Sequence, residues 1–134
     1  MVEASRDTVQ LLSGLLGHMR QIVGDGACYA MLHYGAMEEG KRFGSGTAPA
    51  DLQKVLDRFD HLLLQRTEIL KDDGTNVTIR VHSSPLLENN NQRAVHGIIL
   101  GLVEGALTAS RAGRFKGSVI SGNGEILLEL KRDA

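Results

Sequence analysis

Residues 93–112, which read RAVHGIILGLVEGALTASRA, decide the fold of this chain. Apolar residues recur in this stretch at steps of three and four, which predicts a long helix with one apolar face. The residues of that face are Val95, Ile98, Ile99, Leu102, Val103, Ala106 and Leu107. The residues left over, which we expect to lie in solvent, are Arg93, Glu104, Thr108 and Arg111.

A second face of the same helix is bare, because Gly97, Gly101, Gly105 and Ala109 follow one another at four-residue spacing. Each glycine inside a helix costs about 1 kcal/mol relative to alanine. Three such glycines need an offsetting gain, and the physical gain is the close approach of a neighbour. That neighbour is either a helix or sheet of the same chain or of a dimer mate, or a ligand held in a groove.

Three further helices are predicted before this one. Apolar periodicity indicates a helix over 5–23, a second from Asp25, as its N-cap, to residue 43, and a third with its stripe over 52–63. The second helix carries a stripe of small and medium side chains, which we expect to face the same core as the glycines. Its members are Ala27, Ala30, Met31, Tyr34 and Met37.

Two hairpins complete the chain. Alternating runs over 67–71 and 77–82 flank Asp73-Gly74, and two more runs over 115–121 and 125–131 flank Asn123-Gly124. These dipeptides are typical of tight β-turns. The element order is therefore three helices, a hairpin, a helix and a hairpin. This order predicts an α+β fold in two layers, with a four-stranded antiparallel sheet packed on helices, and we expect residues 1–134 to form one domain.

Composition narrows the possible partners. The 134 residues include 15 basic and 16 acidic side chains, giving a net charge of −1 with no block of either sign. This balance argues against nucleic acid or an anionic membrane surface as a partner. No apolar stretch approaches the ~20 residues that span a bilayer, and the first residues do not resemble a secretory signal. We therefore expect a cytoplasmic protein.

The residues that could carry chemistry are few. Cys28 is the only cysteine, which excludes an internal disulfide, and we expect it to be a buried structural thiol. The five histidines lack the spacing of metal ligands, and His96 is expected to be a surface or capping residue. No carboxylate pair, nucleophile triad or phosphate-binding loop is present, so we expect neither a cofactor nor an enzyme. An enzyme that uses Cys28 or His96 remains a third possibility.

Residues 76–130 resemble the C-terminal half of the 4-vinyl reductase domain and of the related small subunits of the transport protein particle (TRAPP). The matching residues are Ser84, Pro85, Gly101, Gly105, Ala106, Leu107 and Gly122. Residues 32–44, LHYGAMEEGKRFG, are similar to a glycine-containing helix of the same family, with Gly40 and Gly44 at the glycine positions.

The resemblance implies a twisted antiparallel sheet against a helical layer and a homodimer formed through helices. It also implies an apolar cavity for a hydrocarbon, a tetrapyrrole or an acyl group. Many members carry cysteines at positions that correspond here to His96, Ser118 and Ile126. A metal site of that type is therefore not expected.

Two functions follow as hypotheses. The first is a non-catalytic domain that binds or senses a hydrophobic small molecule as a dimer. Its ligand would lie between the 93–112 helix and the N-terminal helices, lined by Met31, Tyr34, Met37, Gly101 and Gly105. The alternative is a structural assembly subunit that acts through protein–protein contacts, as transport-particle proteins do.

Overall fold

The computed structural model describes residues 2–48, 51–63, 65–82, 92–111, 113–122 and 125–133. Its helices are α1 (Val2–Val23), α2 (Asp25–Gly44), α3 (Leu52–Leu63) and α4 (Gln92–Ser110). Its strands are β1 (Arg66–Asp72), β2 (Asn76–His82), β3 (Phe115–Gly122) and β4 (Glu125–Arg132). The predicted element order and the α+β class are confirmed.

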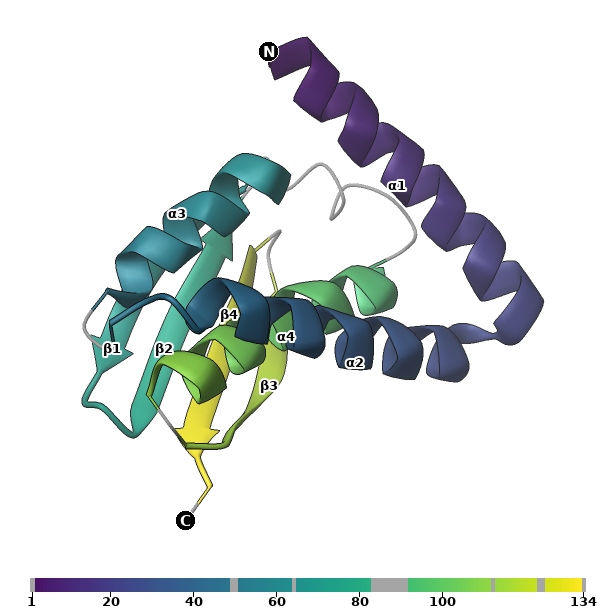
Figure 1. The fold of residues 1–134 in the computed structure, drawn as a ribbon. Coiled ribbons are helices and arrows are strands. Elements are labelled where there is room, and N and C mark those ends of the chain that lie inside the picture. The colour runs from purple at the N-terminus through teal and green to yellow at the C-terminus, as the bar shows by residue number, and fades with distance from the viewer. Residues whose placement is uncertain are drawn as a thin grey trace.

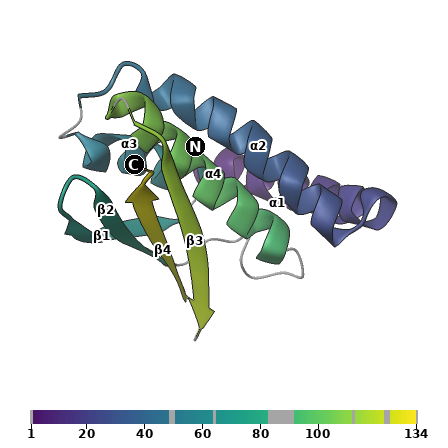
Figure 2. The ribbon, with the colours of Figure 1, turned by 90° about the horizontal axis from the view of Figure 1, so that it is seen from below.

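The four strands form one antiparallel sheet in the order β1-β2-β4-β3. Strand residues alternate between two faces, and the inner face of the two central strands is fully apolar. It consists of Val77, Ile79, Val81, Ile126, Leu128 and Leu130, all buried. The described helices all lie on the side of this inner face, with α3 and α4 packed on it (Figures 1 and 2), so the outer face of the sheet carries the polar half of the pattern.

The core lies between this inner face and the helices α3 and α4. The predicted apolar face of α4 is confirmed, because five of its members, Val95, Ile99, Val103, Ala106 and Leu107, are at most 2% exposed. From α3, Leu52, Val55, Leu56 and Phe59 enter the same core. The ring of Phe43, at the end of α2, contacts the Phe59 ring edge-on at 5.3 Å between centroids. The sheet therefore positions α4, and α4 positions α2.

Backbone geometry confirms the predicted turn at Asp73-Gly74 and corrects the predicted N-cap of α2. Gly74 has φ +92°, a conformation that suits glycine, and it closes the β1–β2 hairpin. The predicted Asn123-Gly124 turn and the Ser84-Pro85 turn lie outside the described residues. Asp25 is not the N-cap of α2; Gly24, at φ +86°, occupies that position. The Asp25 carboxylate instead lies 3.5 Å from the Nε of Arg20.

Helix α1 is attached to the rest of the molecule over little of its surface. It buries Leu16 and half-buries Leu12, while the chain turns sharply at Gly24 between α1 and α2. In Figure 1, α1 runs away from the sheet and α2 lies alongside α4. The two long helices at the N-terminus thus have different surroundings, one packed into the fold and one projecting from it.

Candidate functional site

The bare faces of α2 and α4 meet, and we call this contact the glycine seam: Gly40 and Gly44 of α2 with Gly97, Gly101 and Gly105 of α4. A Cβ atom added at Gly101 would lie 2.6 Å from the carbonyl oxygen of His33. One added at Gly105 would overlap the carbonyl oxygen of Met37, and one at Gly40 would overlap that of Leu102. The offsetting neighbour of the α4 glycines is therefore the backbone of α2 in the same chain.

The residues predicted to line a ligand do not gather in one place. Gly101 and Gly105 lie in the seam, and Met37 is half-buried beside it. Met31 and Tyr34 lie on an exposed side of α2, 56% and 63% exposed, so the expectation that their stripe faces the core is wrong. The reason is steric: only the side of α2 with Gly40 and Gly44 permits backbone contact with α4, and this turns Met31 and Tyr34 outward.

Glu104 lies at the seam, and its exposure to solvent is predicted wrongly by the sequence pattern. The pattern predicts it in solvent, but it is 4% exposed. One carboxylate oxygen is in hydrogen-bonding contact with the Nε2 of His33, and the other accepts a hydrogen bond from the backbone N–H of Gly117 at 3.2 Å. The carboxylate thus ties α4 to α2 and to β3. Its position seven residues after Gly97 places it on the glycine face, which is the signal that would have revealed its burial.

His33 also has a ring partner within α2. Its imidazole stacks on the Tyr29 ring, with 5.8 Å between centroids and 9° between planes. The Tyr29 ring in turn lies near Gly97, where an added Cβ would be 3.1 Å from it. The seam is therefore filled along its length by backbone, by an aromatic pair and by one buried carboxylate.

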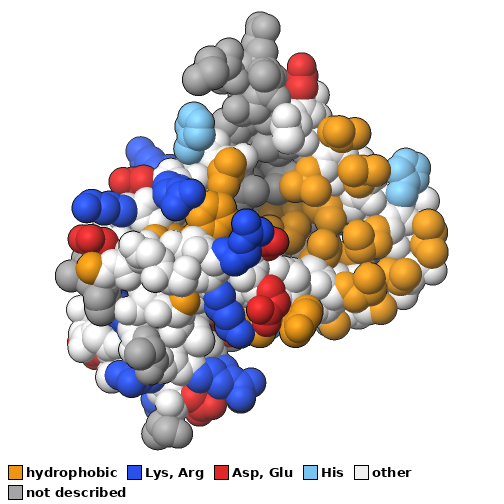
Figure 3. Space-filling view, viewed as in Figure 1, with side chains coloured by type: hydrophobic (Ala, Val, Ile, Leu, Met, Phe, Trp, Pro, Cys, Tyr) orange, Lys and Arg blue, Asp and Glu red, His pale blue; other side chains and the backbone are white. Residues whose placement is uncertain are grey.

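A large apolar surface lies on α1 and the exposed side of α2, and we call it the α1–α2 face. Figure 3 shows apolar side chains gathered across these two helices. Leu11, Leu15 and Ile22 share one side of α1, because their spacings of four and seven residues return to the same side of a helix. The members of the face are Leu11, Leu15, Ile22, Val23, Met31 and Tyr34, each at least 40% exposed.

The exposed area of the chain is consistent with an uncovered surface. The chain exposes 7501 Å², whereas area scaling gives roughly 6,900 Å² for a compact monomer of this mass. Exposed apolar patches of several hundred Å² on a monomer usually mark an interaction site. The α1–α2 face is thus the apolar candidate site of this chain.

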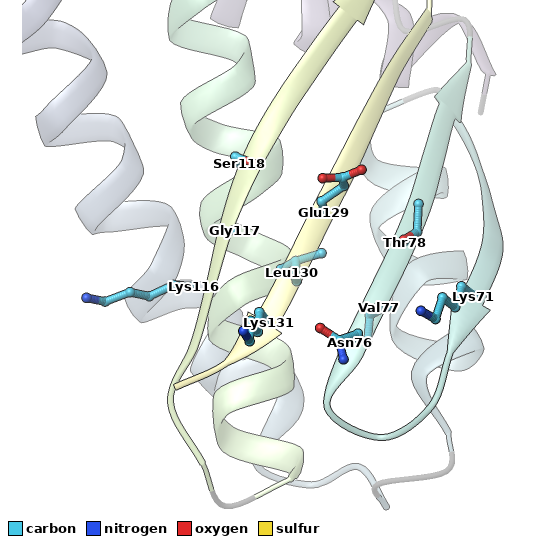
Figure 4. A pocket seen from close by; sticks show the side chains of 10 residues that line it. All are labelled: Lys71, Asn76, Val77, Thr78, Lys116, Gly117, Ser118, Glu129, Leu130 and Lys131. Carbon is cyan, nitrogen blue, oxygen red and sulfur yellow. The ribbon is translucent and has the colours of Figure 1, made fainter. Parts of the chain in front are cut away.

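A polar candidate site lies on the outer face of the sheet, in a depression of about 510 Å³. Figure 4 shows its lining, which comes from all four strands. Asn76 and Thr78 of β2, Ser118 of β3 and Glu129 of β4 supply polar groups, and Lys71, Lys116 and Lys131 supply ammonium groups. Sequence reasoning missed these lysines, because no two of them are neighbours in a motif.

Cys28 and His96 are the two residues that the sequence left as possible catalytic groups. Cys28 is buried and free, as predicted. His96 is half-buried, and burial lowers the pKa of its imidazole. Among the described residues, no group of three or more His, Cys, Asp or Glu side chains could hold a metal ion. No helix in the described part of the chain has the length and apolar character needed to cross a membrane.

The sequence matches no family profile and no curated protein, so the comparison with known proteins rests on the fold. This chain shares its fold with a TRAPP subunit and with a vinyl-4-reductase family protein, the two kinds of protein that the resemblance named.

The solved structures of similar fold include the following two. One is a trafficking protein particle complex subunit 3 from Naegleria fowleri, covalently bound to palmitic acid. It has a TM-score of 0.69 and 15% identity over 96% of this chain and 97% of that one. The other is a vinyl-4-reductase family protein from Methanocaldococcus jannaschii. It has a TM-score of 0.55 and 19% identity over 74% of this chain and 68% of that one.

Proposed function

We propose that this chain is a non-enzymatic assembly subunit that forms a homodimer through the α1–α2 face. The observation that carries the proposal is the row of large apolar side chains left in solvent on two adjoining helices. The TRAPP subunit with the same fold supports an assembly role. This is the second of the two functions predicted from the sequence, and the geometry favours it because the seam leaves no space between α2 and α4.

Helices α1 and α2 are long enough to form a stable dimer interface. Helix α1 has 22 residues and α2 has 20, which corresponds to lengths of about 33 and 30 Å. A stable interface buries about 800 Å² of each partner, and two helices of these lengths offer such an area. An apolar face is complementary to itself, so a second copy related by a twofold axis covers it without requiring another chain.

The test is the oligomeric state of two matched variants, measured by size-exclusion chromatography with light scattering. Leu15 on the face and Leu62 on α3 are similarly exposed, at 56% and 54%. We expect Leu15→Glu to give a monomer and Leu62→Glu to remain a dimer, because only the first buries a charge in the interface. A parent protein that is monomeric at high concentration, or equal behaviour of both variants, would overturn the proposal.

A second candidate function is the binding of an apolar ligand, favoured by the palmitic acid on the TRAPP subunit of the same fold. In this proposal Met31, Tyr34 and Met37 contact the ligand. Gly101 and Gly105 act indirectly, because they set the close approach of α2 and α4 that positions those side chains. Since Met31 and Tyr34 belong to the α1–α2 face, a second copy would cover the ligand.

Native mass spectrometry of the purified protein tests this candidate. We expect an added mass on the dimer that is absent from the Tyr34→Glu variant and retained by Leu62→Glu. A dimer that carries no added mass would contradict the ligand-binding proposal and leave the proposed assembly role unaffected. An added mass on the Leu15→Glu monomer would show that the ligand does not need the second copy.

A further inference from the structure

We propose that the depression on the outer face of the sheet binds the phosphate group of a small phosphorylated molecule. The first observation is a pair of like charges held directly opposite each other. Lys116 of β3 and Lys131 of β4 are partners in the antiparallel register, and both belong to the uncovered face. Like charges at directly opposed positions of neighbouring strands are destabilising. An anion bound between them converts this repulsion into attraction.

The two lysine side chains of this pair point apart, and the Lys116 ammonium group lies 3.7 Å from the Asp133 carboxylate. In Figure 4, Lys116 extends away from Lys131 over the edge of β3, while Lys71 reaches from β1 toward Asn76 of β2. Lysine stems are flexible, so the Lys116 ammonium group can turn back when an anion offers a partner. The three ammonium groups would then surround the depression from β1, β3 and β4.

Two of the three lysines have an acidic neighbour. Lys71 lies 3.9 Å from Asp73 and Lys116 lies 3.7 Å from Asp133, and all four side chains are about half exposed or more. Exposed pairs at such distances are weak, so an anion of higher charge can compete with these aspartates for the ammonium groups. Among the described residues that line the depression, three are lysines and one, Glu129, carries a carboxylate.

The neutral groups of the depression fit an oxyanion. The hydroxyls of Thr78 and Ser118 flank Glu129 in one row of the sheet, and the amide of Asn76 lies beside Lys131 in the next row. Hydroxyl and amide groups donate hydrogen bonds to phosphate oxygens, and ammonium groups supply the charge. A volume of about 510 Å³ lies within the range of small-molecule sites, ~300–1,000 Å³. These features together favour a small phosphate ester.

The experiment measures binding of inorganic pyrophosphate at fixed ionic strength by NMR titration of the backbone amides. We expect perturbation of residues in β2, β3 and β4 around the depression. Lys131→Gln should weaken binding about fivefold, the effect of one unit charge at about 4 Å in a water-like surrounding. Glu129→Gln should strengthen binding by a similar factor, because it removes a carboxylate from the lining. Lys54→Gln on α3 makes the same charge change at an exposed position and should leave binding unchanged.

Three outcomes would overturn the proposal. The first is that no backbone amide signal changes when pyrophosphate is added. The second is an equal loss of affinity in Lys54→Gln and Lys131→Gln, which would indicate attraction by overall charge. The third is lysine-dependent binding to vesicles containing anionic lipid without binding of pyrophosphate, which would indicate a membrane-surface contact. None of these results depends on the oligomeric state, so failure here is distinguishable from failure of the proposed assembly role.

Discussion

The glycine seam and the α1–α2 face share helix α2 and show opposite relations between side-chain size and burial. In the seam, the smallest residues of the chain bring two backbones into contact, and no larger residue fits. On the face, leucine, isoleucine, methionine and tyrosine side chains lie in solvent. Hydrophobicity alone therefore does not indicate which side of a helix the fold buries.

The difference follows from what each contact stabilises. The seam attaches α2 to α4, and α4 belongs to the core over the sheet, so the seam is part of the folding unit. The face contributes little to the folding of one chain, and the free energy of burying its apolar side chains remains to be gained by association. Substitutions in the two regions should therefore affect different measurements, stability in one case and oligomeric state in the other.

The largest effect should come from adding one carbon atom to the seam. Gly105→Ala places a Cβ on the carbonyl oxygen of Met37, so two backbones must separate. We expect the free energy of unfolding to fall by about 3 kcal/mol, at the upper end for overpacked sites. Urea unfolding in the monomeric Leu15→Glu background measures this loss without a contribution from association.

The matched control for Gly105 is Gly35, another helical glycine, where an added Cβ atom would have nothing within 4 Å. Gly35→Ala should raise stability by about 0.5–1 kcal/mol, because alanine has the higher helix propensity. Equal effects at the two positions would mean that the seam is looser than the backbone contacts indicate.

The second effect concerns the carboxylate at the seam. Glu104→Ala removes the acceptor of the Gly117 N–H and the partner of His33. A half-buried donor left without an acceptor, together with the lost contact to His33, should cost about 2 kcal/mol, and we expect a loss of that size in urea unfolding. Glu104→Gln keeps an acceptor and should lose less. Glu39→Ala, at an exposed position of α2, should be nearly neutral, and a loss as large as that of Glu104→Ala would contradict the burial argument.

The sequence predicted the elements well and their mutual orientation less well. The apolar steps of 93–112 and the Asp73-Gly74 turn are local signals, and the structure confirms the elements that they predict. Which side of α2 faces solvent cannot be predicted from α2 alone, because it depends on the positions of the glycines in α4. The lysine depression depends on β2 pairing with β4, which brings Lys71, Lys116 and Lys131 to one face. Long-range pairing of this kind has no signature in the spacing of single residues.

The third effect is a pH-dependent loss of stability, and it concerns an ion pair between the end of α4 and the sheet. Arg111, just after α4, donates hydrogen bonds to both carboxylate oxygens of Asp72, at 2.8 and 2.6 Å. These bonds hold the pKa of Asp72 below its ordinary value of 3.8. A folded pKa below the unfolded one means that the stabilisation is fully present above pH ~4. It is lost as the pH falls through the folded value.

Arg111→Gln should therefore lower the free energy of unfolding by about 1.5 kcal/mol at pH 7. Its difference from the parent should shrink as the pH falls below ~4 and through the pKa of folded Asp72, which lies below 3.8. Urea unfolding curves recorded from pH 7 into the acid range measure the loss at pH 7 and its decrease at low pH. Lys54→Gln, which removes a weak exposed pair with Asp51, should follow the parent at every pH. A difference for Arg111→Gln that persists unchanged in acid would assign its effect to packing rather than to the Asp72 pair.

The smallest effect on stability should come from a polar substitution on the α1–α2 face. Ile22, at 83% exposed, is the most exposed large apolar side chain of the α1–α2 face. Ile22→Gln should change the stability of the dilute monomer by less than about 0.5 kcal/mol. In the parent, the unfolding midpoint should rise with protein concentration, because dimerisation stabilises the folded state by mass action. In Ile22→Gln this rise should be reduced. A loss of several kcal/mol in the dilute variant would place Ile22 in the folding unit and erase the distinction between the seam and the face.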